Sequence, residues 1–224
     1  IGTAALSEKL HKVLASYGCG SRREMERWIE AGRVVVNGKP AHLGQRVQEV
    51  DAIKLDGKLL KRVQGAVQHT RVLLYHKPEG EVCTRSDEKG RATIFEHLPH
   101  LKVGRWITVG RLDYKTTGLL LVTNSGDLAH RLMHPSSGLE REYLVRVYGD
   151  VSEQILDRLH QGVMLEDGKG QFKRIEAQGP EASNRWFRVV VTQGRNLFVR
   201  RMWMSQGLTV TRLKRVRFGP LLLP

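Results

Sequence analysis

The sequence has few cysteines, few aromatic residues and no long apolar run. Its two cysteines, Cys19 and Cys83, lie far apart and match no zinc-ligand spacing, so we interpret them as free thiols of a cytoplasmic protein. No apolar stretch approaches the roughly 20 residues of a membrane-spanning helix, and we recognise no signal-peptide pattern within the given sequence. No basic amphipathic helix with an aromatic face stands out either, which disfavours a membrane surface as partner.

Acidic residues are missing from the C-terminal fifth of the chain. Between Ala182 and Pro224 there is no Asp or Glu. The basic residues of this segment are Arg185, Arg188, Arg195, Arg200, Arg201, Arg212, Lys214, Arg215 and Arg217. With a net charge of +14 and a pI of about 10.2, the chain is expected to bind a polyanion. The segment is either a solvated basic surface or, as we favour, a groove that follows a phosphate backbone.

Residues 7–62 carry the pattern of two short helices followed by a small sheet. Ser7 is placed to cap the first helix, which Gly18 would end. A capping-box pattern at Ser21–Glu24 predicts the start of the second helix. Asn37-Gly38, between two short apolar stretches, is the strongest short signal for a hairpin. The small size of this unit and the aperiodic residues 63–70 after it predict a separate domain and a linker.

The second half of the chain alternates strand and helix patterns. Val72–Tyr75 predicts a strand, Val82–Thr84 a return strand, and Ile94–Leu98 a short helix. Further on, the predicted elements are strands at 143–148, 172–177, 186–192 and 208–216, with helices at 152–160 and 197–205. Their order is βαββαβ, the ferredoxin-like split pattern. The expected fold class is therefore α+β, with helices on one face of a sheet.

One carboxylate stands out within the stretch from Gly110 to Pro135. Asp113 lies in a polar loop rich in glycine and threonine, and the continuous apolar run Leu119–Val122 follows as a fully buried strand. Most hydrolytic sites pair two carboxylates or add a metal or a Ser/His couple. Taken alone, the pattern favours a turn or capping role for Asp113.

The N-terminal motif EKLHKVLASYGCGSRREMERWIEAGRVVVNGK resembles the small RNA-binding domain shared by ribosomal protein S-four and many RNA-modifying enzymes. The resemblance covers residues 8–57 and implies that two helices and the adjoining turn lie on structured RNA. The basic residues expected to reach RNA are Lys12, Arg22, Arg23 and Arg33.

Five motifs follow in order through the rest of the chain. They are HKPEGEVCT at 76–84, GRLDYKTTGLLLVTNSGDLAHRLMHP at 110–135, EREYLVRV at 140–147, GRNLFVRRM at 194–202 and RLKRVRFGPLLL at 212–223. Together they resemble the RsuA-type pseudouridine synthases. The resemblance implies an RNA-binding domain at 1–64 and a catalytic domain with a mixed, mostly antiparallel sheet at 65–224. It also implies isomerisation of uridine to pseudouridine in ribosomal RNA, without a cofactor or a metal.

The resemblance assigns roles to individual residues. It makes Asp113 the catalytic carboxylate, pairs it with Arg200, and places the ring of Tyr143 on the uracil. Since the working form of Asp113 is the anion, a neighbouring cation is expected. The residues expected to bind substrate are Arg111, Lys77, Arg201 and Leu213. Positions 197–198 are Leu-Phe, where related enzymes often carry a charged pair.

Several alternatives stay open. The turn Leu165–Gly168 and the residues Arg131–Pro135 favour family members that act on large-subunit (23S) rRNA. We also expect a monomer that acts in the cytoplasm. A synthase for small-subunit rRNA, or a non-catalytic rRNA-binding assembly factor on the same fold, would share most of the motifs. A DNA-binding helix-turn-helix protein would explain residues 7–32 alone.

Overall fold

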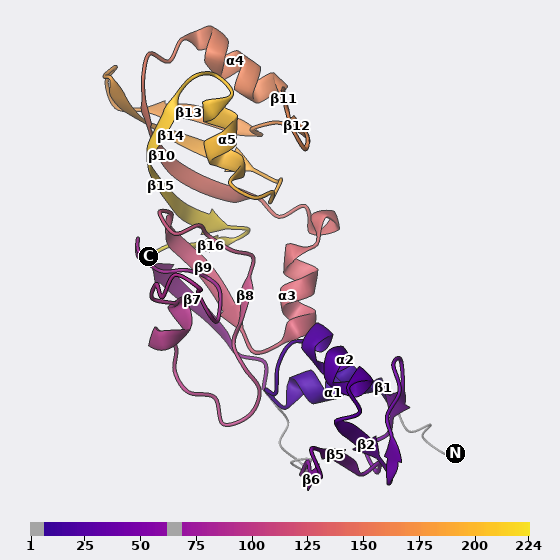
Figure 1. Cartoon of the computed structure of the whole chain (residues 1–224). Coiled ribbons are helices and arrows are strands. Elements are labelled where there is room, and N and C mark those ends of the chain that lie inside the picture. Colours follow the sequence, from indigo (N-terminus) through magenta and orange to yellow (C-terminus); the bar gives the residue numbers. More distant parts are fainter. Residues whose placement is uncertain (1–6, 62–68) are drawn as a thin grey trace. The chain divides into compact units, whose positions relative to one another are not determined.

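The computed structural model describes residues 7–61 and 69–224, which divide into two compact units (Figure 1). One unit comprises Ile1–His69 together with His100–Arg105, and the other comprises Thr70–Pro99 and Trp106–Pro224. The expected domain boundary at 64/65 and most of the expected linker at 63–70 lie outside the described residues. No described helix is long and apolar enough to cross a membrane.

The first unit contains the two expected helices, α1 (Leu10–Ser16) and α2 (Arg22–Glu30). Ser21 caps α2 by accepting the Glu24 N–H at 3.1 Å, as the capping-box pattern predicts. The prediction that Ser7 caps α1 is wrong. Residues Glu8–Lys9 form strand β1, which pairs with β4 (Arg46–Val47), so the helix starts later and the Ser7 hydroxyl accepts from Arg46 Nε instead.

A four-stranded antiparallel sheet completes this unit. Its strands, in the order in which they pair, are β3 (Lys39–Pro40), β2 (Val34–Val36), β5 (Ile53–Leu55) and β6 (Lys58–Leu59). Asn37 and Gly38 both have positive φ, at 50° and 80°, which is the geometry of the predicted two-residue hairpin turn. The apolar faces of α1 and α2 pack on β2 and β5 and form a single core.

The second unit is built on an eight-stranded sheet. The main path runs β13 (Arg174–Gln178), β14 (Asn184–Val191), β10 (Arg141–Tyr148), β15 (Thr209–Phe218), β9 (Thr117–Thr123) and β7 (Val72–Lys77). Strand β8 (Ile107–Val109) pairs with β9, and β16 (Leu221–Leu222) pairs with β15. A separate hairpin consists of β11 (Val163–Leu165) and β12 (Gly168–Gly170).

One half of this sheet confirms the βαββαβ prediction. Its elements follow in the order β10, α4 (Glu153–Gln161), β13, β14, α5 (Phe198–Met204), β15. Trp203 of α5 packs between Phe172 and Phe187, with ring centroids 6.0 and 5.0 Å away. Alternate residues of β10 and β14, such as Val145 and Val189, complete this core, as the period-2 alternation of a strand requires.

The other half carries β7, β8 and β9, and it shows one wrong prediction as well as two elements, β8 and α3, that were not predicted. Val82–Thr84 is not a return strand, because only Val82 pairs, in a single bridge to Thr93. Thr93 immediately precedes the 3₁₀ helix η1 (Ile94–His97). Helix α3 (Gly126–Met133), capped by Ser125, was not expected and precedes the short turn η2 (Pro135–Ser137). Residues Leu119–Val122 are buried within β9, as predicted.

The two halves of the sheet meet where β9 runs parallel to β15. This seam has only two register pairs, Thr117 with Lys214 and Gly118 with Arg215. At Gly118, which has φ +107°, an added Cβ would lie 2.1 Å from the Arg215 carbonyl oxygen. The seam therefore requires a residue without a side chain at position 118.

We expect Gly118→Ala to destabilise the second unit by more than about 3 kcal/mol, because the backbone of β15 cannot move away without breaking the seam. Urea denaturation of the intact chain, followed by far-UV circular dichroism, measures the loss. Gly179→Ala is the matched control, with φ +71° and no atom within 4 Å of an added Cβ, and should cost only about 1 kcal/mol. Equal losses in the two variants would contradict the steric argument.

Candidate active site

Asp113 lies in the loop between β8 and β9, and the loop itself orients its carboxylate. The Lys115 N–H donates to Oδ1 at 3.0 Å, and the Thr116 N–H donates to the Asp113 carbonyl at 3.0 Å. This local turn is the side-chain-to-backbone pattern that Asp favours. The buried strand β9 begins at Thr117, so the loop is fixed at its C-terminal end.

Lys77 supports the same loop from the interior. Its side chain is fully buried, and Nζ donates to the carbonyls of Pro78 and Thr116 at 2.9 and 2.8 Å. Burial lowers the pKa of Lys77. The prediction that Lys77 binds substrate is therefore wrong, because its ammonium group has no exposed surface and is used to hold the loop together.

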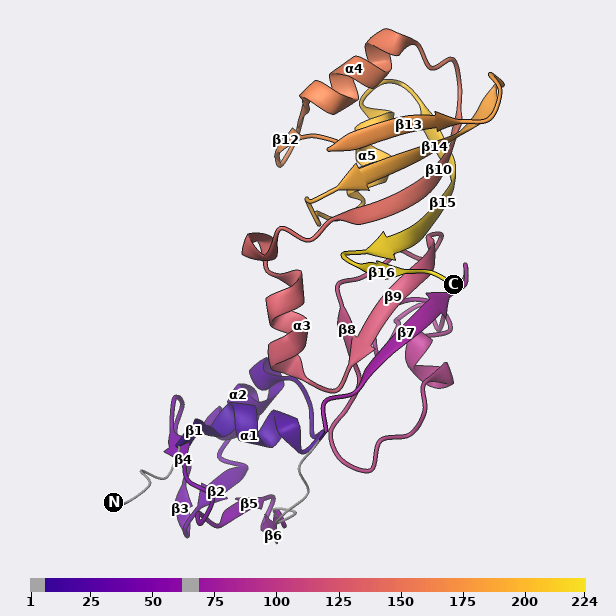
Figure 2. The same cartoon turned by 180° about the vertical axis from the view of Figure 1, so that it is seen from behind.

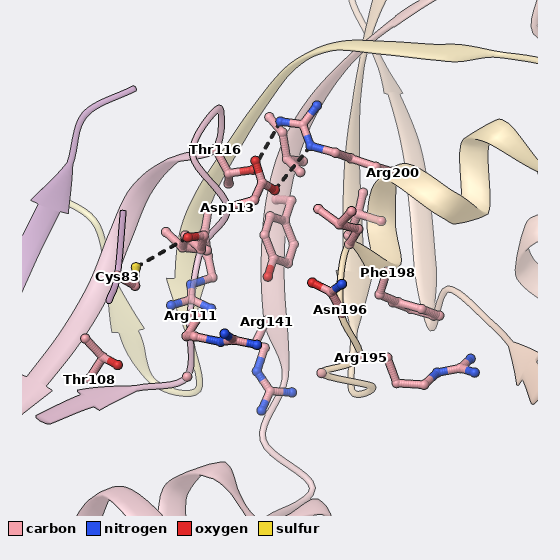
Figure 3. Close-up of a pocket in the computed structure, with 18 of the residues that line it drawn as sticks. Cys83, Thr108, Arg111, Asp113, Thr116, Arg141, Arg195, Asn196, Phe198 and Arg200 are labelled. Carbon is pink, nitrogen blue, oxygen red and sulfur yellow. Dashed lines mark hydrogen bonds and ion pairs between the residues drawn. The ribbon is translucent and has the colours of Figure 1, made fainter. Parts of the chain in front are cut away.

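Arg200 reaches Asp113 from the first turn of α5. Its Nε donates to Asp113 Oδ2 at 3.2 Å, and one terminal nitrogen donates to Thr116 Oγ1 at 3.1 Å (Figure 3). The Thr116 hydroxyl in turn donates to Asp113 Oδ2 at 2.5 Å. The pairing implied by the resemblance is thus present, and Thr116, which sequence reasoning missed, completes a three-residue network.

A second network holds the segment from which Arg200 projects. The two terminal nitrogens of Arg201 donate to both oxygens of Asp167, at 2.8 and 2.9 Å, and these bonds lower the pKa of Asp167. Arg195 donates to Asp167 Oδ1 at 2.7 Å and also to backbone carbonyls of the β11–β12 hairpin. Arg201 is therefore tied to Asp167, and it does not line the cavity described below, contrary to its expected contact with substrate.

The uncharged pair at 197–198 has a structural explanation. Phe198 is buried and packs edge-to-face against Phe172, with ring centroids 6.2 Å apart. Leu197 is exposed and begins α5 with φ +51°. Phe198 therefore anchors α5 in the core, whereas Leu197 presents an apolar side chain to the cavity.

Asp113 and Arg200 line a cavity of about 720 Å³. Tyr143, Leu213 and Arg111, three further residues expected at the site, line it as well. The charged side chains of the lining are Asp113, Arg91, Arg111, Arg141, Arg195, Arg200 and Arg215. A single carboxylate thus faces a wall of arginines, which suits a substrate that carries phosphate.

Arg141 and Arg215 were not expected in this lining. Arg141 donates to the Thr192 carbonyl at 3.1 Å, and burial lowers its pKa. Arg215 is almost fully buried and donates through Nε to the Leu119 carbonyl at 2.7 Å. A signal existed for Arg141, because it precedes Tyr143 by two residues and therefore lies on the same face of the strand. In Figure 3, Arg141 and Arg111 lie on the side of the cavity away from Arg200.

The acid-free C-terminal segment is not a free basic surface. Carboxylates from other elements pair with most of its arginines. These pairs are Arg185–Glu181, Arg188–Glu142, Arg195–Asp167, Arg200–Asp113, Arg201–Asp167, Arg217–Glu140 and Arg217–Glu142. The interpretation as one continuous phosphate groove therefore does not hold, although Arg212 and Lys214 keep accessible surface.

The basic residues expected to reach RNA in the first unit differ in their surroundings. Arg22 and Arg23 are exposed on α2, and Lys12 is half-buried on α1. Arg33 binds Asp56 through two bonds of 2.9 and 2.6 Å, and its guanidinium lies 4.1 Å from the ring centroid of Trp28. Arg33 thus has fewer donors available for RNA than the sequence pattern implies.

No group of three potential metal ligands occurs within residues 7–61 and 69–224. The thiol of Cys83 lines the cavity and contacts the Leu112 carbonyl at 3.3 Å. Burial raises the pKa of this thiol, which favours its neutral form.

Comparison with known proteins identifies relatives of both units. Residues 71–205 match the family model of RNA pseudouridylate synthases, and residues 8–53 match that of the S4 domain. The chain is 60% identical to ribosomal large subunit pseudouridine synthase B of Pseudomonas aeruginosa over 219 residues, or 97% of this chain and 57% of that protein. It is 55% identical to the protein of the same name from Escherichia coli K12, covering 98% of this chain and 76% of that protein. The chain thus spans little more than half of one relative.

A solved structure supports the same relationship. The crystal structure of a pseudouridylate synthase matches with a TM-score of 0.64 and 26% sequence identity. The match covers 96% of this chain and 90% of that one.

The Asp167 network makes a testable prediction about residues 193–200. We expect Asp167→Asn to speed amide hydrogen exchange there, because the neutral amide cannot bind both Arg195 and Arg201 as the carboxylate does. Exchange of the intact chain, read by mass spectrometry, measures this change. Asp150→Asn, at another exposed aspartate, is the control and should leave exchange unaltered. Unchanged exchange in Asp167→Asn would show that the segment is held without the network.

Proposed function

The chain belongs to the RNA pseudouridylate synthase family, and on this basis we propose that it isomerises uridine to pseudouridine in large-subunit ribosomal RNA. The observation that supports this most strongly is the single carboxylate of Asp113, paired with Arg200 in an arginine-lined cavity. A hydrolytic site would be expected to contain a second carboxylate, a metal or a Ser/His couple. Isomerisation within one nucleotide needs none of these.

The reaction breaks the bond between N1 of the uracil and C1′ of the ribose, turns the uracil within the cavity, and joins C5 to C1′. The proton on C5 leaves and one is gained at N1, so atoms and electrons balance without an added reactant. Because the same uracil must be rejoined to the ribose, the cavity has to hold the detached base within reach of C1′.

The two oxygens of Asp113 are not equivalent. Among the described residues, Oδ2 accepts from Thr116 and Arg200, whereas Oδ1 accepts only the Lys115 N–H. We therefore assign to Oδ1 the contact with the ribose, because it retains unused acceptor capacity. Both chemical routes, attack on C1′ and removal of a ribose proton, can start from this oxygen.

The remaining cavity residues supply binding and orientation. We assign Tyr143 to stacking on the uracil, with its hydroxyl near the proton that leaves C5. Leu213 packs against the base, and Arg111 contacts phosphate. Flipping the target nucleotide out of its helix costs a few kcal/mol, which backbone contacts from the arginines of the cavity offset.

The first unit would select the RNA rather than take part in the chemistry. The S4-type helices would place Arg22, Arg23 and Lys12 on phosphates, a mode that reads the shape of folded RNA. In line with the family resemblance, we propose that the protein acts in the cytoplasm as a monomer.

Asp113→Asn is expected to lower pseudouridine formation by at least ~10³-fold, because the neutral amide cannot act as nucleophile or base. Tritium release from rRNA labelled at C5 of uridine measures the loss, and filter binding should show RNA affinity within a few-fold of the parent. Asp150→Asn is the control and should keep full activity. Retained tritium release in Asp113→Asn would refute the assignment. Absence of release by the parent protein would favour the non-catalytic assembly factor.

Arg200→Lys tests the geometry of the network. Lysine keeps the positive charge but cannot bond Asp113 and Thr116 at once as the guanidinium does. We expect kcat to fall by about 10²-fold with KM nearly unchanged, because a small displacement of the carboxylate carries that cost. Full activity in Arg200→Lys would mean that charge alone is required.

The rRNA target is tested by mapping pseudouridines in a strain that lacks the gene, with and without the protein restored. We expect the loss and recovery of a modification in large-subunit rRNA. Loss from small-subunit rRNA would instead support the alternative target.

A further inference from the structure

One face of the four strands β13, β14, β10 and β15 is not covered by a described helix. Helix α5 packs on the opposite face through the core around Trp203. Figure 1 shows α5 in front of these strands, and Figure 2, seen from behind, shows the strands in front of α5. We call the uncovered side the open face.

The open face carries aromatic side chains that the core does not use. On β10 and β14 the core residues have odd numbers, so Trp186 and Tyr148 point to the open face. Trp186 is 38% exposed and Tyr148 is 56% exposed. Trp186 lies near the start of β14, paired with strands on both sides, and its exposure departs from the usual burial of large aromatic residues. This exposure favours a binding role for the face.

Basic residues flank Trp186 in register across the sheet. Arg146 lies directly opposite Trp186 on β10, with its guanidinium 5.9 Å from the ring centroid, and Arg212 lies opposite Arg146 on β15. Lys214 and Arg188 occupy the next row, on either side of Leu144. The row from Trp186 to Arg212 thus places an aromatic ring and two guanidiniums across three neighbouring strands.

Acidic residues do little to neutralise this face. Glu142 lies at its end and binds Arg188 and Arg217, at 3.3 and 3.5 Å. Glu176 lies opposite Arg188 on β13. Within the described part of the chain, Arg146, Arg212 and Lys214 form no ion pair with a carboxylate; Arg146 donates instead to the Thr211 hydroxyl at 3.0 Å. The charge excess is therefore available to an anionic partner.

The open face is separate from the cavity. Tyr143 and Arg146 lie three residues apart on β10, so their side chains point to opposite faces of the sheet. Tyr143 lines the cavity, whereas Trp186, Tyr148, Arg146 and Arg212 do not.

We propose that the open face binds a single-stranded segment of the substrate RNA, with bases stacked on Trp186 and Tyr148 and phosphates on Arg146, Arg212 and Lys214. This inference rests on the proposed function for the identity of the polymer. An aromatic platform interleaved with cations binds single strands without regard to sequence, because every base has a π-face. An acidic protein would match the charges but would give the exposed rings no comparable partner.

Binding of a dye-labelled oligoadenylate of twelve nucleotides, followed by fluorescence anisotropy, tests the proposal. This RNA contains no uridine, so its binding is independent of the isomerase reaction. We expect Trp186→Ala to weaken binding by at least about fivefold and Trp186→Phe to restore most of it, since stacking is worth roughly 1–3 kcal/mol per base. Arg212→Glu combined with Lys214→Glu should weaken binding and flatten its salt dependence.

Two controls match these variants. Met164→Ala removes a side chain that is 76% exposed on β11, and Lys89→Glu reverses an exposed charge in the loop before Arg91. Both should bind oligoadenylate as the parent does. The proposal fails if Trp186→Ala binds normally, or if Trp186→Phe loses as much affinity as Trp186→Ala. It also fails if a decaglutamate peptide binds through Arg212 and Lys214 more tightly than the RNA, which would assign the face to an acidic protein.

Discussion

The arrangement of the second unit depends on the close contact between Gly118 and the backbone of Arg215. Through this contact two sheet halves become one, although only two register pairs join them. Gly118 follows the Asp113 loop directly, and Arg215 lies opposite Tyr143. The side chain of Arg215 adds a bond to the Leu119 carbonyl. This narrow seam fixes the Asp113 loop relative to β15, because neither backbone can shift without losing the hydrogen bonds that join the two strands.

The charged side chains around the cavity are positioned by ion pairs between distant parts of the chain. Asp113 and Asp167 each bind arginines of the segment 195–201, one on the cavity side and the other at the β11–β12 hairpin. The contact with Asp113 holds the Arg200 side chain beside the carboxylate. The contacts of Asp167 with Arg195 and Arg201 hold the backbone segment from which Arg200 projects. The bidentate contact between Arg201 and Asp167 is suited to this task because it restricts orientation as well as distance.

The alternation of side chains along a strand gives the sheet two different surfaces. On β10 the odd-numbered residues build the core under α5 and, at Tyr143, one wall of the cavity. The even-numbered residues face the other side, where Arg146 lies beside Trp186. The same strand can therefore contribute to the chemistry and to a separate surface without any conflict between the two.

Local features of the sequence were sufficient to predict much of the fold. The Ser21 cap, the Asn37-Gly38 turn, the buried strand at Leu119–Val122 and the βαββαβ order all depend on neighbouring residues or on a short period. Asp113, Tyr143 and Arg200 could be named only through resemblance to a family, since nothing local distinguishes them from a turn, a core aromatic and a surface arginine. Only the tertiary structure shows that Lys77 is buried beneath the Asp113 loop, that Thr116 joins Asp113 to Arg200 and that Asp167 binds Arg201. Apart from the local bond between Thr116 and Asp113, these contacts join residues 34 to 87 positions apart. Such pairings depend on how strands and helices pack rather than on any pattern along the chain.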